Sequence, residues 1–132
     1  MSTKLFVIAA AAVCGLAAQD SSHRIKVNVP FGFEANGVQL AAGTYIVTAP
    51  GNRPVVTVSN EATGKRIMIM AGAASDNRLD VNSLEFKRYN DVYFLSGVKV
   101  AAAGKKFALP HSRLEKEMAI AIQPEVIVAR AR

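Results

Sequence analysis

The hydrophobic pattern of this chain is most regular over residues 24–34, where apolar and other residues alternate without interruption. Successive side chains of a β-strand point to opposite faces, so a period of two predicts a strand with one buried face and with Lys26 and Glu34 on the other. The Asn36-Gly37 step that follows is typical of a tight hairpin turn, and Thr44–Thr48 reads as the return strand. The residues expected on the buried face are Ile25, Val27, Val29, Phe31 and Phe33.

The rest of the chain carries short apolar segments separated by turn-forming residues. Asn90-Asp91 lies between two such segments and predicts a second hairpin, and Gly97 predicts a bulge or bend in its return strand. Further strands are expected at Val55–Ser59, Lys65–Ala71, Val81–Tyr89, Val92–Leu95 (continuing past Gly97 through Val98 and Val100), Phe107–Leu109 and Glu125–Arg130. Seven or eight short strands at this spacing predict an all-β domain, an antiparallel sandwich or a small partly closed barrel.

The segment Lys65–Ala71 is apolar on both faces of the expected strand. Ile67 and Ile69 fall on one face, and Met68 and Met70 fall on the other. Such a pattern is typical of a central strand that is covered on both sides, so we expect the methionines to fill the core. The alternative is an adaptable apolar surface that binds a ligand.

One helix is expected near the C-terminal end of the chain. Ser112 followed by Glu115 forms a capping box, in which Ser112 accepts from the Glu115 amide and the Glu115 side chain reaches back. Leu114 and Met118 are four residues apart, which predicts an apolar face for packing, and Pro124 limits the helix to about Gln123. We expect this helix to pack across an end or edge of the strands.

The first eighteen residues predict a secretory signal peptide. Lys4 precedes an apolar run from Leu5 to Leu16, which is too short to span a membrane, and small residues suited to cleavage follow it. The expected organisation is a signal peptide (1–18), a polar leader (19–23) and a single β domain (24–132). The protein is therefore expected to be periplasmic or extracellular, with no stable membrane span after the signal is removed.

Composition limits the chemistry of the mature domain. The single cysteine, Cys14, lies in the predicted signal, so the mature domain would have no disulfide and no thiol nucleophile. Apolar residues make up 51% of the sequence and charged residues 20%, which is typical of a folded domain. The formal net charge of +6 is compatible with anionic envelope polymers and also with simple solubility.

Several short motifs together resemble a group of uncharacterised small exported proteins of acidobacterial type. They occur in the same order over most of the mature chain: Val29-Pro30-Phe31-Gly32-Phe33, Leu40-Ala41-Ala42-Gly43-Thr44-Tyr45-Ile46-Val47, Tyr93-Phe94-Leu95, and the helix start from Leu109 to Glu117. This chain has Leu-Ala-Ala-Gly at the turn where Leu-Pro-Ala-Gly is usual. The resemblance implies export and a β-rich fold, and it implies no reaction.

The residues that most often carry catalysis have no supporting context here. His23 lies in the leader and His111 directly precedes the helix cap, and no G-x-S-x-G or H-E-x-x-H motif occurs. Glu115 and Glu117 are two residues apart on a helix, so they point to different sides. We therefore expect no catalytic residues and no cofactor.

The loops and the aromatic residues suggest two binding chemistries, a metal site and a nucleic-acid patch. Asp76, Asn77 and Asp80 offer oxygen ligands for Ca²⁺, but their spacing differs from that of an EF-hand loop, and turn or capping roles explain them. A basic aromatic patch of the kind that binds nucleic acid would comprise Lys87, Arg88, Tyr89, Tyr93 and Phe94. No metal is therefore expected. No nucleic acid is expected either, because export directs the chain away from it.

These observations lead to two expectations about function. The first is a non-catalytic exported domain that acts through surface contacts with an unidentified envelope or extracellular polymer or protein. The alternative is a carrier that holds a small apolar ligand inside the barrel or sandwich, near Met68, Met70 and the helix.

Overall fold

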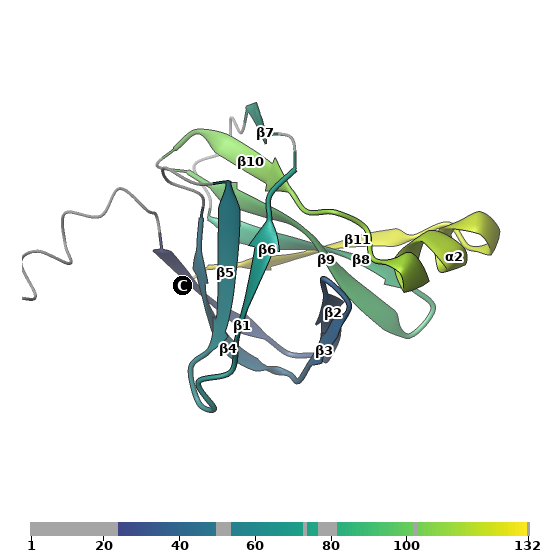
Figure 1. Cartoon of the computed structure of the whole chain (residues 1–132), viewed down its shortest axis with the longest axis horizontal. Coiled ribbons are helices and arrows are strands. Elements are labelled where there is room, and N and C mark those ends of the chain that lie inside the picture. The colour runs from purple at the N-terminus through teal and green to yellow at the C-terminus, as the bar shows by residue number, and fades with distance from the viewer. Residues whose placement is uncertain (1–23, 50–53, 73, 77–81, 102, 132) are drawn as a thin grey trace, which may run out of the picture.

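The computed structural model describes residues 24–49, 54–72, 74–76, 82–101 and 103–131, which form two β-sheets around a shared core (Figure 1). Every neighbouring pair of strands in sheet A is antiparallel. In spatial order, sheet A contains β1 (Arg24–Val29), β4 (Gly43–Thr48), β5 (Val55–Asn60) and β6 (Arg66–Met70). The predicted signal peptide and leader lie outside the described residues.

Sheet B is larger and contains the second half of the chain. A short hairpin adds to it through β2 (Phe33–Ala35), which runs parallel to β9 (Val92–Val100) at the pair Glu34 and Phe94. The main path of the sheet runs β11 (Glu125–Arg130), β8 (Ser83–Tyr89), β9 (Val92–Val100), β10 (Lys105–Ala108) and β7 (Ala74–Asp76), and the hairpin consists of β2 (Phe33–Ala35) and β3 (Val38–Leu40).

The two sheets confirm the predicted all-β sandwich, and the described strands do not close into a barrel. The count of seven or eight strands was too low for two reasons. The opening strand, expected to be continuous over residues 24–34, is divided at Pro30, and β3 and β7 lie outside the strands expected from the sequence. Proline has no N–H to donate to a ladder, so Pro30 ends β1 and the chain crosses from sheet A to sheet B.

This crossover corrects the prediction of one long opening strand. The alternate apolar residues of β1 are buried as expected, as is Phe33 in β2, whereas Phe31 lies between the strands and is half-buried. Glu34 was expected on the solvent face, but it is only 8% exposed, in a strand that is paired with β3 on one side and β9 on the other.

Both predicted two-residue turns are present. Asn36 and Gly37 have φ values of 51° and 79°, as a type I′ hairpin turn requires, and Asn90 has a φ of 56°. The expected irregularity near Gly97 is also confirmed, because Gly97 is opposite Glu85 while Leu95 is opposite Phe86. Ser96 is therefore the extra residue of a β-bulge.

The core is an aromatic cluster surrounded by β-branched residues from both sheets. Phe33 packs edge-on against Tyr45 of sheet A and Phe86 of sheet B, with both pairs of ring centroids 5.2 Å apart. Phe31 stacks on Tyr93 with the ring centroids 3.8 Å apart, and it meets Phe86 edge-on at a centroid distance of 5.0 Å. These rings join the two sheets into one core.

The predicted helix is α2 (Arg113–Ala121), which lies beside the ends of β8, β9 and β11 (Figure 1). Ser112 caps it as expected, with its hydroxyl oxygen accepting the Glu115 N–H at 3.2 Å. The predicted apolar face was wrong, because Leu114 is exposed and the buried residue of α2 is Glu115, which is 2% exposed. The Glu115 carboxylate contacts Tyr89 of β8 and His111, which precedes the cap, instead of reaching back to the cap backbone.

Candidate binding site at the edge of β6

Strand β6 forms one edge of sheet A and carries two exposed methionines. Ile69 faces the core and is buried, with Ile67 half-buried beside it. Met68 and Met70 face outward and are 66% and 62% exposed. Both are long apolar side chains on the last strand of an open sheet, an arrangement that natural sheets usually avoid.

This placement corrects the expectation that the methionines fill the core of a central strand. The sequence showed apolar residues on both faces of the segment, and no local signal distinguishes a strand covered twice from an edge strand with an open apolar face. The alternative, an adaptable apolar surface, is the one that agrees with the exposure of Met68 and Met70. They lie outside the space between the sheets, so a ligand held there would not contact them as the carrier hypothesis supposed.

The backbone of β6 also has hydrogen-bonding groups with no partner among the residues that the structure describes. The Lys65 carbonyl accepts from Asn60 N–H at 2.8 Å and the Ala71 N–H donates to the Pro54 carbonyl at 2.7 Å, so both groups point toward β5. Backbone groups alternate in direction along an antiparallel strand, and the β5–β6 register is regular between these two bonds. The N–H and C=O groups of the intervening even-numbered residues, 66, 68 and 70, therefore point to the open edge.

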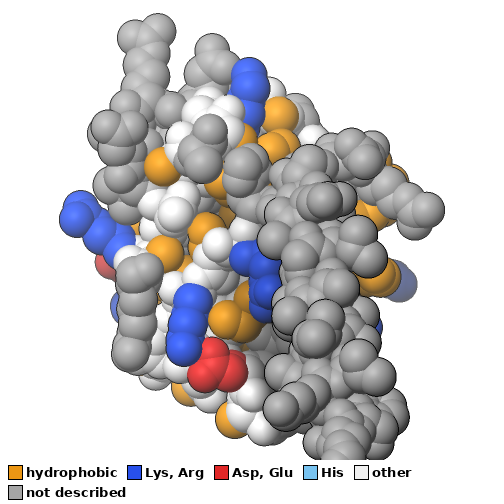
Figure 2. All heavy atoms as spheres, turned by 90° about the vertical axis from the view of Figure 1, so that its left-hand side faces the viewer, with side chains coloured by type: hydrophobic (Ala, Val, Ile, Leu, Met, Phe, Trp, Pro, Cys, Tyr) orange, Lys and Arg blue, Asp and Glu red, His pale blue; other side chains and the backbone are white. Residues whose placement is uncertain are grey.

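Two cationic side chains lie at the start of the open edge of β6. Lys65 and Arg66 are both exposed, and neither forms an ion pair with another residue in the described ranges. Across the same outer face, Lys26 of β1 is paired with Glu61 at 3.0 Å. Figure 2 views this side of the molecule, where Lys and Arg side chains, some with an acidic side chain beside them, lie among hydrophobic ones.

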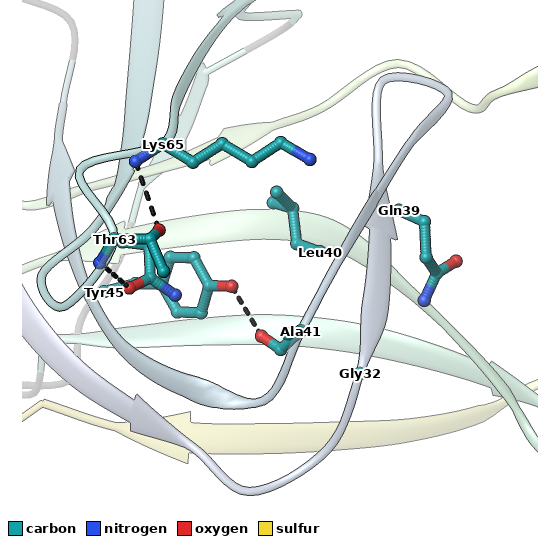
Figure 3. Close-up of a pocket in the computed structure, with 8 residues that line it drawn as sticks. Gly32, Gln39, Leu40, Ala41, Tyr45, Thr63 and Lys65 are labelled. Carbon is teal, nitrogen blue, oxygen red and sulfur yellow. Dashed lines mark hydrogen bonds between the residues drawn. The ribbon is translucent and has the colours of Figure 1, made fainter.

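A crevice lies next to Lys65, between the β5–β6 turn and the β2–β3 hairpin (Figure 3). Its volume is about 440 Å³, and it is lined by Gly32, Gln39, Leu40, Ala41, Tyr45, Asn60, Thr63 and Lys65. Leu40 and Tyr45 are buried and form an apolar floor, and the Tyr45 hydroxyl donates to the Ala41 carbonyl. The crevice is therefore apolar at its base, with a cation at its rim.

The β5–β6 turn holds Lys65 at this rim. Asn60 Oδ1 accepts the N–H groups of Ala62 and Thr63 at 2.9 and 3.0 Å, and Thr63 Oγ1 accepts the Lys65 N–H at 3.2 Å. These bonds fix the backbone from which the Lys65 side chain extends toward the hairpin, above Leu40 (Figure 3). An ammonium over an apolar crevice can hold an anionic group whose apolar part enters the crevice.

A second cluster of polar side chains is centred on the buried Glu115 carboxylate. Its Oε2 atom accepts the Tyr89 hydroxyl at 3.1 Å and lies 2.9 Å from His111 Nδ1. A carboxylate that orients a histidine also occurs in hydrolase triads, but the neighbouring Ser112 hydroxyl caps α2. The cluster instead connects the start of α2 to β8 and anchors the helix.

The same cluster predicts a loss of stability at alkaline pH. Burial, the Glu115 charge and the hydrogen bond to Glu115 together raise the pKa of Tyr89 to about 12. A tyrosine in the unfolded chain has a pKa of about 10. The contribution of the neutral Tyr89 hydroxyl to stability is therefore fully present below that pH and disappears as the pH rises through about 12. Urea unfolding followed by circular dichroism between these two pH values should show a steeper decline for the wild type than for Tyr89→Phe, and parallel profiles would contradict the assignment.

Within the described ranges, the aromatic and acidic candidates from the sequence are not brought together into a site. Tyr89 and Phe94 are buried with their rings 5.6 Å apart, and Tyr93 is stacked on Phe31, so these rings are not an exposed platform for bases. Glu117 is exposed and lies near Arg113, on a different side of α2 from Glu115, as expected.

The possible metal ligands are only partly described. Asn77, Asp80 and His23 lie outside the described residues, and among the described ones no three His, Cys, Asp or Glu side chains are placed to hold a metal ion. Sequence reasoning did not find Lys65 or the crevice, because its walls come from three separate segments and none carries a recognisable motif.

Comparisons with known protein families, curated proteins and solved structures found no match for this chain. No helix within the described ranges is both long and apolar enough to cross a membrane.

Proposed function

We propose that this protein is a non-catalytic exported domain that acts through surface contacts, with the outer side and edge of β6 as its contact surface. Export is supported by the signal-like pattern of residues 1–18 and by the resemblance to small exported proteins. The contact surface comprises Arg66, Met68 and Met70 together with the preceding Lys65. It combines apolar side chains, cations without acidic partners in the described chain and free backbone groups.

The observation that carries this proposal is the exposure of Met68 and Met70 on an edge strand. Two adjacent long apolar side chains on one strand favour contact with another molecule, because covering them removes apolar surface from water. Methionine is flexible, so such a surface adapts to partners of different shape.

The experiment is sedimentation of the purified domain, residues 19–132, with washed envelope fragments of the producing cells. The double variant Met68→Ser, Met70→Ser is expected to bind about tenfold more weakly than the wild type, since two side chains lose their apolar burial. The matched control is Val126→Ser, Val128→Ser, which changes two apolar residues on the outer face of β11 that are 55% and 47% exposed.

The control is expected to bind like the wild type. Equal losses in both double variants would mean general adhesion of apolar side chains, and unchanged binding in the methionine variant would refute the proposed surface.

The second candidate function is a carrier, and the apolar crevice beside Lys65 is the observation that favours it. Its position differs from the one expected from the sequence, since the crevice lies near the β2–β3 hairpin and not beside Met68, Met70 and the helix. A carrier of this kind would bind its ligand without the methionines. If the methionine variant sediments with envelope fragments as well as the wild type does, this alternative is favoured.

A further inference from the structure

The open edge of β6 fixes the direction in which an added strand would run. All pairs in sheet A are antiparallel, and β6 runs from Arg66, next to the crevice, to Met70. A strand that continues this antiparallel order would therefore run toward the crevice and reach Lys65 with its C-terminal end. Backbone pairing of this kind is a known way for a sheet to bind an extended peptide.

The alternation of side chains determines what enters the crevice. Residues 65, 67 and 69 lie on the inner side of β6, and residues directly opposite in an antiparallel pair share a face. A peptide residue opposite Lys65 would thus point into the crevice, over the apolar floor of Leu40 and Tyr45. The residue before it would lie on the outer face beside Arg66, and the one before that would lie on the inner side beside Ile67.

The positive charge of Lys65 is complementary to the carboxylate at the C-terminus of a peptide. Lys65 stands at the crevice rim and forms no ion pair with another described residue, and its side chain extends toward the hairpin above Leu40 (Figure 3). A peptide that stops opposite Lys65 places its terminal carboxylate near this ammonium. The crevice volume of about 440 Å³ also has room for one large apolar side chain.

A second copy of this chain fits the edge less well. Antiparallel pairing of two β6 strands about Met68 would place Arg66 of each copy opposite Met70 of the other, so neither cation gains an acidic partner. With a formal net charge of +6, the two copies also repel each other at long range. An anionic partner is favoured.

From this geometry we infer that β6 binds the free C-terminus of an extended peptide, with an apolar last side chain in the crevice and its carboxylate at Lys65. The inference rests on the proposed contact surface and specifies its partner. The recognised pattern is apolar at the last and third-last positions, and an acidic residue at the second-last position suits Arg66.

The test is fluorescence anisotropy with a labelled peptide, Gly-Ser-Val-Ser-Val-Glu-Leu, and an array in which the last residue is Val, Ile, Met or Phe. At least one member with a free carboxylate is expected to bind. Its C-terminal amide should bind at least about tenfold more weakly, because a charge-assisted contact is lost. Lys65→Met should weaken the free acid similarly while leaving the amide unchanged, and Lys116→Met on α2 is the matched control.

Backbone pairing has its own test in the same assay. The peptide amide three residues before the last would donate to β6, whereas the amide two residues before the last would point away from it. N-methylation of the first should weaken binding far more than N-methylation of the second. Equal effects would contradict strand addition.

The inference is overturned if no peptide in the array binds at millimolar concentration, or if the amides bind as well as the acids. Self-association that depends on Met68, seen by size-exclusion chromatography without peptide binding, would identify a second copy as the partner instead. If the envelope assay depends on Met68 and Met70 while every peptide fails, the proposed surface stands and the peptide inference falls. If both assays fail, both proposals fall.

Discussion

Replacing Phe33 with alanine is expected to lower the free energy of unfolding by about 3–5 kcal/mol. Phe33 is fully buried and joins the sheets through its contacts with Tyr45 and Phe86, so the deleted ring leaves a cavity that neither sheet can fill. Domains of this size are stable by only about 5–15 kcal/mol, so the variant should unfold at much lower urea concentration. Urea titration followed by circular dichroism measures the difference.

Two control variants separate burial from the general effect of shortening a side chain. Phe31→Ala should cost less than Phe33→Ala, because Phe31 is only half-buried. Lys26→Ala should change stability by at most about 1 kcal/mol, since its ion pair with Glu61 is exposed. A larger loss at Phe31 than at Phe33 would mean that the crossover, and not the core, carries the stability of this segment.

Replacing Glu115 with alanine is expected to destabilise the protein by about 1.5–3 kcal/mol, the usual contribution of hydrogen bonds to a charged group. The variant leaves the buried Tyr89 hydroxyl without its acceptor and also removes the contact to His111. The loss should appear both in urea unfolding and as faster amide hydrogen exchange in α2, because Glu115 is the buried residue of that helix.

The matched control for Glu115 lies two residues further along the same helix. Glu117→Ala removes an exposed carboxylate that lies 3.6 Å from Arg113, so its effect should stay within about 0.5 kcal/mol. Similar small effects for both variants would show that Glu115 is not an anchor.

Local patterns were sufficient to predict the elements whose causes are local. The Asn36-Gly37 turn, the Asn90 turn and the Ser112 cap each depend on a few neighbouring residues, and all three are present. Alternation also identified the strands of the second half of the chain, apart from β7. Pro30 shows the limit, since alternation continued through it although the chain changes sheets there.

What the sequence did not predict depends on contacts between distant segments. Glu115 reads as a capping residue, and only the proximity of Tyr89 explains why it is buried in preference to Leu114. The exposure of Met68 follows from the order of strands in sheet A, which no pattern within β6 specifies. The crevice likewise exists only when the β2–β3 hairpin approaches Lys65.

The bridge between Val27 of β1 and Ala131, just after β11, has a consequence for how the chain folds. The first and last described strands meet along one side of the sandwich, so this side closes only when nearly the whole domain is available. Contacts between residues so far apart in sequence make folding slow relative to that of helical proteins of the same size. Slow closure keeps the newly made chain unfolded for longer, so its apolar strands stay exposed to contact with other chains during folding.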